Sequence, residues 1–325
     1  MTHLSYAITL FLSLLMTSLP FLLLGIFVSS WLLVFVDEHQ LTAKFPHNRI
    51  LGALIGSSLG MIIPVCQYGN VPVTRRLLMQ GAPLSVAISF LVASPTVNPI
   101  VLWLTWQAFP NQASILFYRL LLAWLIAFIL GLIFSTHTEK PWTSDEYTSP
   151  RCYLLPSGTF LLPSEESQPL HRVGNLVYEY KTTTTARKSL KVGLSLLWQN
   201  AVQETLELGS ILIIGCAIAT LVQVFLPQGQ ILNWGQSPPS QILVMILLGF
   251  ILSLGSPNSG FFLSFFTSTF LKGSLLSFLL FSSVVDLKSL GLLFFVLRVK
   301  AVVYLLILVL ELTLLSALIF NFYLS

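Results

Sequence analysis

Residues 19–32 read LPFLLLGIFVSSWL, a run of fourteen residues without one charged side chain. They belong to a longer apolar segment, 4–36, which exceeds the roughly 20 residues that a helix needs to cross a bilayer core of about 30 Å. The N-terminal sequence MTHLSYAITLFLSLLMTSLPF has neither the basic first region nor the small-residue cleavage site of a signal peptide. The stretch therefore predicts a retained transmembrane helix.

The whole chain has the composition of a membrane protein. Of its 325 residues, 55% are hydrophobic and only 9% are charged, against about a quarter charged residues in soluble domains. Of the 16 basic and 12 acidic residues, 13 lie in the segment 136–191, so the rest of the chain could not cover a water-exposed surface. This composition predicts a polytopic membrane protein and excludes a disordered chain, a collagen and a disulfide scaffold.

We expect an all-α, polytopic integral membrane protein with about eight transmembrane helices. The segment 136–191 is rich in proline, serine, threonine and charge and is expected to be a solvated linker. It divides the chain into a first transmembrane repeat, 1–135, and a second, 192–325. The predicted spans lie at roughly 4–36, 50–80, 82–109, 114–135, 192–226, 241–271, 273–297 and 299–322.

Basic residues set the expected orientation, because cytoplasmic loops are enriched in lysine and arginine. Arg75 and Arg76 follow the second span and the linker carries further basic residues, which places both segments in the cytoplasm. With four spans before the linker, the N-terminus falls on the same side. Arg298 and Lys300 between the last two spans do not follow this rule. No basic cluster alternates with aromatic residues, so we expect no nucleic-acid partner.

An internal repeat relates the two halves. The segment 19–32 resembles GSILIIGCAIATLV at 209–222, and MQGAPLSVAISF at 79–90 resembles LKGSLLSFLLFS at 271–282. The matches keep their order along the chain, which indicates a duplication of four spans. An even number of spans predicts parallel repeats, whereas a miscounted span would make them inverted.

Helix breakers interrupt four of the predicted spans near their middle. The breaks lie at 64–70, 94–99, 255–260 and 282–288. Proline removes a backbone donor and glycine loosens a helix, and the freed groups need partners within the bilayer. Because the breaks fall at corresponding places in both repeats, they predict a substrate site near the midplane, where half-helix ends meet.

Ionisable residues inside predicted spans are candidates for function, because a charge in the bilayer is costly. Asp286 corresponds to Asn98 of the first repeat, and Lys288 follows it. The two could form a structural ion pair, or Asp286 could bind substrate or carry a proton. Glu311 in the last span could exchange a proton or hydrogen-bond a neighbouring helix. Glu204, near one end of the fifth span, is expected to extend to the membrane surface.

Other residues have two interpretations each. Arg119 and Arg298 open the fourth and eighth spans. They could anchor the protein at the outer lipid headgroups, or they could form a pair that attracts an anion. Cys66 could be a soft metal ligand or a small packing residue. All five histidines lie in predicted loops or termini, and no nucleotide-binding or hydrolase motif is present. We expect no enzyme activity, no metal site and no cofactor.

Three sequence runs resemble a known family. They are IPVCQYGNVPV at 63–73, GAPLS with FLVASPTVNPI at 81–100, and FSSVVDLK at 281–288. These runs resemble the bacterial predicted-permease family that includes the trivalent organoarsenical efflux permeases. The resemblance implies an inner-membrane permease that moves substrate outward. Tyr68 and Ser256 stand where that family often has further cysteines, so the resemblance implies the permease architecture rather than the arsenical substrate.

The predicted function is transport of a small molecule or ion by alternating access around a midplane cavity. The partners expected are membrane lipid, the substrate and further copies of the chain in a homo-oligomer. Proton coupling is expected at Asp286 and Glu311. The alternative is a non-transporting scaffold or assembly factor, favoured if the breaks pack dry with Asp286 and Lys288 neutralising each other. The expected substrate-binding residues are Cys66, Gln67, Gly69, Asn70, Pro95, Asn98, Pro99, Ser256, Asn258, Gly260, Asp286 and Lys288.

Overall fold

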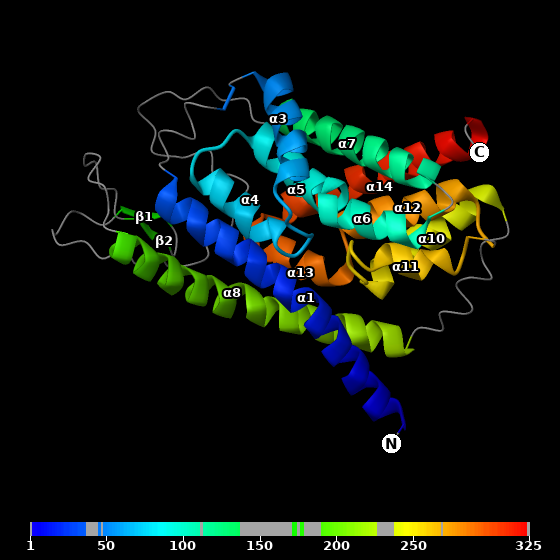
Figure 1. Ribbon diagram of the computed structural model, residues 1–325, viewed down its shortest axis with the longest axis horizontal. Coiled ribbons are helices and arrows are strands. Elements are labelled where there is room, and N and C mark those ends of the chain that lie inside the picture. The colour runs from blue at the N-terminus through cyan, green and yellow to red at the C-terminus, as the bar shows by residue number, and fades with distance from the viewer. Residues whose placement is uncertain are drawn as a thin grey trace.

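The computed structural model is almost entirely helical (Figure 1). It describes residues 2–36, 45–46, 48–110, 113–136, 171–173, 176–178, 190–225, 237–267 and 269–323. The first half contains α1 (Thr2–Phe35), α3 (Arg49–Ile62), α4 (Asn70–Met79), α5 (Leu84–Val97), α6 (Pro99–Ala108) and α7 (Ala113–Thr136). The second half contains α8 (Leu190–Phe225), α10 (Pro238–Leu252), α11 (Ser259–Ser264), α12 (Lys272–Val284), α13 (Leu287–Val296) and α14 (Val299–Tyr323).

The linker contributes the exception to the helical fold. Within it, β1 (His171–Val173) pairs antiparallel with β2 (Leu176–Tyr178). Most of the linker lies outside the described residues. The expectation of an all-α chain therefore holds for the membrane part that the structure describes, with this small hairpin added.

Six segments of the described chain are long and apolar enough to span a membrane, two fewer than predicted. They are Leu4–Phe35, Leu84–Ala108, Ala113–Thr136, Gly193–Phe225, Lys272–Val296 and Val299–Tyr323. The predicted spans at 50–80 and 241–271 are each divided into two shorter helices. At 1.5 Å per residue, the 14 residues of α3 and the 15 of α10 extend only about 21–23 Å, less than the bilayer core.

The packing of α3 shows that the first of these segments turns back. Gly52 faces Ser85 near the start of α5, and Gly60 faces Ser94 near its end, so α3 and α5 run parallel. Glycines every four residues let the two backbones approach closely. Since α4 connects the end of α3 to the start of α5, it must return to the side from which α3 came. The α3–α4 segment is a hairpin that enters and leaves on one side.

The second half repeats this arrangement. The Ser277 hydroxyl of α12 lies 3.5 Å from the carbonyl of Ile242 in α10, and Gly249 further along α10 packs against Ser282. Helices α10 and α12 therefore also run parallel. The chain from α11 to residue 271 returns between them, which makes a second hairpin.

Helices α1 and α8 pack side by side and run in opposite directions (Figure 1). The N-terminal end of α1 lies at one end of the bundle, and the start of α8, beside β1 and β2, lies at the other. The N-terminus thus lies at the opposite end from the linker, not at the same end as the sequence predicted. The physical reason is that the α3–α4 hairpin returns to the end from which it came, so three apolar segments, and not four, run along the bundle before the linker.

The two broken spans form the interior of the bundle. The most apolar part of Leu84–Ala108 is 83% buried and that of Lys272–Val296 is 67% buried, whereas the other four spans reach only 28–39%. The unbroken helices α1, α7, α8 and α14 therefore present apolar faces to the lipid, while irregular backbone is kept inside the protein.

Candidate functional site

The four helix breaks meet in the middle of the bundle. The tip of the first hairpin, residues 63–69, lies against the α5–α6 break. The Ser94 hydroxyl donates to the carbonyl of Val65 at 2.7 Å, and the Asn98 amide lies 3.4 Å from the same carbonyl and 4.0 Å from the Cys66 sulfur. These side chains satisfy backbone groups that the break leaves without helical partners.

Asn98 also starts the next helix. Its side-chain oxygen accepts from the backbone N–H of Val101 at 2.9 Å, and Pro99 occupies the first helical position. This is the usual chemistry of a helix N-terminus, an Asn cap followed by proline. At the Asn98-Pro99 pair, one helix of the span therefore ends and the next helix begins.

Asp286 plays the corresponding part in the second half. It caps α13: its carboxylate accepts from the N–H of Ser289 at 2.7 Å, and the Ser289 hydroxyl accepts from the N–H of Asp286 at 2.9 Å. The same carboxylate accepts from the Tyr68 hydroxyl at 2.7 Å and from the Gln67 amide. The first hairpin thus supplies two donors to a fully buried carboxylate from the other repeat.

Lys288 is also fully buried but does not contact Asp286 directly. Its ammonium group donates to the Ser18 hydroxyl of α1 at 2.9 Å and lies 5.0 Å from the centroid of the Tyr68 ring. The salt bridges described in the chain do not include the pair. Tyr68 therefore separates the two charges, binding Asp286 with its hydroxyl and Lys288 through a cation–π contact.

The tip of the second hairpin completes the cluster. Ser253 adopts a left-handed conformation (φ 48°), and its hydroxyl accepts from the N–H of Leu287 at 2.9 Å. Gly255, with φ 79°, packs against the Tyr68 ring and hydroxyl. A residue with a side chain would be strained at this glycine. Ser256 is buried beside them, and its hydroxyl has no hydrogen-bond partner.

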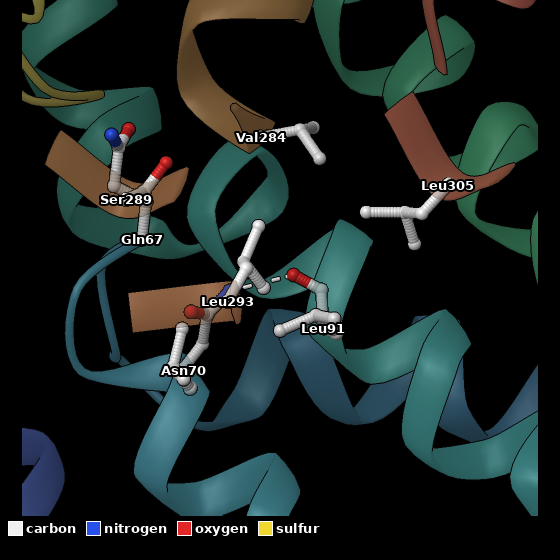
Figure 2. A pocket seen from close by; sticks show the side chains of 8 residues that line it. Gln67, Asn70, Leu91, Val284, Ser289, Leu293 and Leu305 are labelled. Atoms are coloured by element: carbon white, nitrogen blue, oxygen red, sulfur yellow. Dashed lines mark hydrogen bonds between the residues drawn. The ribbon is translucent and has the colours of Figure 1, made fainter. Parts of the chain in front are cut away.

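A narrow pocket lies on one side of the cluster (Figure 2). Gln67, Asn70 and Ser289 form its polar wall, and Leu91, Val284, Leu293 and Leu305 are among its apolar lining. The amide of Asn70 donates to the carbonyl of Leu91 at 2.6 Å. The gaps between these side chains are too narrow for a water molecule.

Two acceptors in this pocket have no partner. They are the side-chain oxygens of Gln67 and Asn70. Their orientation is set, because each amide nitrogen already donates to an oxygen that can only accept. Buried acceptors without partners are unfavourable and rare in native proteins, so these two oxygens are expected to gain hydrogen-bond donors when the closed arrangement opens.

The structure brings together ten of the twelve predicted substrate-binding residues as buried residues of the four breaks. Gly69 packs against Phe21 and Gly25 of α1, and Gly260 against α6. Asn258 and Pro99 are exposed. Glu311 lies apart, exposed on α14 at mid-span, so it is not brought together with Asp286. The predicted site residues do not include Tyr68, although an aromatic hydroxyl inside a polar break indicates a buried hydrogen-bond donor.

Charged side chains also pair at the linker end of the bundle. Arg76 of α4 contacts Glu204 of α8 at 3.0 Å, and the Ser29 hydroxyl donates to Glu204 at 3.2 Å. Arg75 lies 3.7 Å from Glu207. Glu204 is 1% exposed and does not extend to the membrane surface as predicted, because the first hairpin brings a guanidinium to it.

Comparison with known proteins gives a family. Residues 3–322 match the family model ArsP_1, described as predicted permease. The chain is 35% identical over 282 residues to "UPF0718 protein YcgR" of Bacillus subtilis (strain 168), covering 87% of this chain and 85% of that protein. It is 31% identical over 283 residues to the "Putative two-component membrane permease complex subunit" of Streptococcus mutans, covering 87% and 84%. No solved structure matches.

Proposed function

The chain belongs to the predicted-permease family, and on that premise we propose that it moves a small solute across the bacterial inner membrane through the four-break cluster. The observation that carries this proposal is the meeting of two hairpin tips and two broken spans around buried Asp286 and Lys288. Irregular backbone and charge at membrane depth are costly and are retained where they serve a pathway.

Alternating access is the mechanism that this architecture supports. Each half has three spans and one hairpin, and the two halves begin with helices of opposite direction, α1 and α8. Such inverted repeats allow one arrangement to open toward each side around a shared site. We place the linker in the cytoplasm, because Arg75 and Arg76 lie at its end of the bundle, with both chain termini outside and movement outward.

The pocket is closed in this arrangement, so transport requires the hairpin tips to separate from the broken spans. The scaffold alternative would be favoured by a dry interior with Asp286 and Lys288 neutralising each other. The interior is indeed tightly packed, but Tyr68 separates the two charges, and two acceptors remain without partners. These features support a site that changes partners during a cycle. We assign Asp286 the binding of substrate or of a coupling proton.

Growth and transport of the Asp286→Asn variant test this function. A deletion strain grown with a panel of metals, metalloids and organic arsenicals reveals a protective substrate, and the variant is then expressed in that strain. Transport should be abolished while the protein still inserts, because Asn keeps the size and cap of Asp286 but not its charge. Full transport by this variant would contradict the assigned role. Cys66→Ser serves as the comparison for a thiol role.

The position of Glu311 favours a second candidate function, in which the chain is a subunit of a membrane complex. This carboxylate lies at the middle of α14 among exposed Ile307, Leu310 and Leu315. A charge facing lipid at that depth is strongly unfavourable, and a neighbouring chain could supply a donor. The Streptococcus mutans relative is itself named as a complex subunit. We propose that further copies of the chain cover this face.

Counting chains in lipid tests this candidate. Single-molecule photobleaching should give more than one copy per particle for the unmodified protein and one copy for Glu311→Leu. Leu310→Ala, a change at the neighbouring exposed position, should keep the assembly. Single copies of the unmodified protein would remove the candidate without affecting the transport proposal.

A further inference from the structure

The guanidinium of Arg119 lies fully buried in the half of the bundle farther from the linker. Arg119 belongs to the second turn of α7, whose last residue precedes the linker, and its side chain is 0% exposed. It donates to the Thr105 hydroxyl of α6 and to the Ser283 hydroxyl of α12, the latter at 3.0 Å. The sequence interpretation of Arg119 as a headgroup anchor is therefore wrong, because neighbouring helices enclose it.

No carboxylate of the described chain neutralises this charge. Arg76 has Glu204 as its partner, and Asp286 and Lys288 lie on two sides of Tyr68. The salt bridges among the described residues do not include Arg119. Arginine stays protonated in proteins, and a buried charge without a counter-charge is strongly destabilising. The counter-charge of Arg119 therefore has to come from an anion that is not part of the chain.

The surroundings of Arg119 are suited to oxygen atoms of an anion. Its Nε has no hydrogen-bond partner. A guanidinium with free donors beside hydroxyl groups binds oxyanions in a directional way. The symmetric position in the other repeat lacks this environment, since Arg298 is exposed.

The location connects Arg119 to the four-break cluster. Ser283 precedes Asp286 by three residues in the same broken span, and Thr105 follows Asn98 in the other. Gly260 of the second hairpin packs against Thr105. A solute that passes the cluster on the side away from the linker therefore passes the guanidinium.

We propose that the transported solute is a small oxyanion and that Arg119, with Thr105 and Ser283, forms its binding site on the outer side of the cluster. This assignment rests on the proposed transport function and names its substrate class. The solute supplies the counter-charge that the chain lacks.

Thermal unfolding of the purified full-length chain in detergent tests the site. Sodium sulfate, phosphate and nitrate are compared with sodium chloride at constant ionic strength. At least one oxyanion should raise the unfolding midpoint of the unmodified protein with a saturating dependence on concentration. Arg119→Gln should lose this shift, and Arg119→Lys should need an about tenfold higher concentration, because charge-assisted hydrogen bonds are lost. Arg298→Gln, the matched control, should respond like the unmodified protein.

Three outcomes would overturn the proposal: no oxyanion shifts the unmodified protein, Arg119→Gln keeps the shift, or anionic phospholipid alone reproduces it. If Arg119→Gln does not insert, an unchanged response of Arg119→Lys overturns the proposal in the same way. Proteoliposome flux separates this inference from the transport proposal. Oxyanion binding without flux contradicts transport, whereas flux of a cation or neutral solute without oxyanion binding contradicts the assigned substrate class.

Discussion

Tyr68 is the residue that joins the two halves of the molecule. Its hydroxyl binds Asp286 of the second repeat, its ring lies 5.0 Å from the Lys288 ammonium group, and Gly255 of the second hairpin packs on it. The side chain is 2% exposed, so both interactions occur where water does not compete with them. Removing the hydroxyl and removing the ring should therefore have separable effects.

Tyr68→Phe should reduce transport strongly while leaving insertion unchanged and lowering the unfolding temperature less than Tyr68→Leu does. The variant keeps the ring near Lys288 but removes one hydrogen bond to a charged carboxylate, worth about 1.5–3 kcal/mol. The measurement is flux of the identified substrate together with the thermal unfolding midpoint. Tyr68→Leu, which also removes the ring, should lower both. Equal behaviour of the two variants would show that the hydroxyl has no role of its own.

At the scale of elements, small residues determine which helices approach one another. Gly52, Gly56 and Gly60 form one face of α3 against α5, and Gly25 of α1 approaches the backbone of Gly69 in the first hairpin tip. A Cβ at these glycines would collide with backbone atoms or side chains of the neighbouring helix. The close approach holds the hairpin within the bundle, although α3 and α4 are too short to span it.

Gly56→Ala should destabilise the protein by about 1–3 kcal/mol, because the added methyl group meets the backbone of Val86 in α5. Gly209→Ala is the matched control, since no atom lies within 4 Å of its Cβ and alanine is the better helix former. Unfolding of both variants in the same detergent gives the comparison. Equal stability would contradict the close packing of α3 on α5.

At the scale of the whole molecule, the two hairpins change the topology. Each half of the described chain contains three apolar segments long enough to span a membrane instead of four, and α1 and α8, which begin the two halves, run in opposite directions. With an odd number of spans in each half, the repeats that we propose are inverted rather than parallel. The correspondence of Asn98 with Asp286 is retained, because both cap the second helix of a broken span.

Cysteine labelling tests this topology. Cys152 of the linker should react with a membrane-impermeant maleimide from the cytoplasmic side alone. In a Cys152→Ser background, Thr2→Cys and Ser325→Cys should react from the outside alone, because an odd number of crossings separates each terminus from the linker. Labelling of right-side-out and inverted vesicles measures both. Reaction of Thr2→Cys on the same side as Cys152 would contradict three spans before the linker and support the eight-span arrangement.

The sequence by itself determined the membrane character of the chain and the positions of the four breaks, whereas the duplication of the two halves stays a prediction. These are local or periodic properties, since hydropathy, proline and glycine act on the chain where they occur. Tertiary structure decided that two broken segments return instead of crossing, that Tyr68 separates Asp286 from Lys288, and that Arg119 is buried while Arg298 is exposed. Each of these depends on which helix packs against which, a contact between residues distant in sequence that local patterns do not contain.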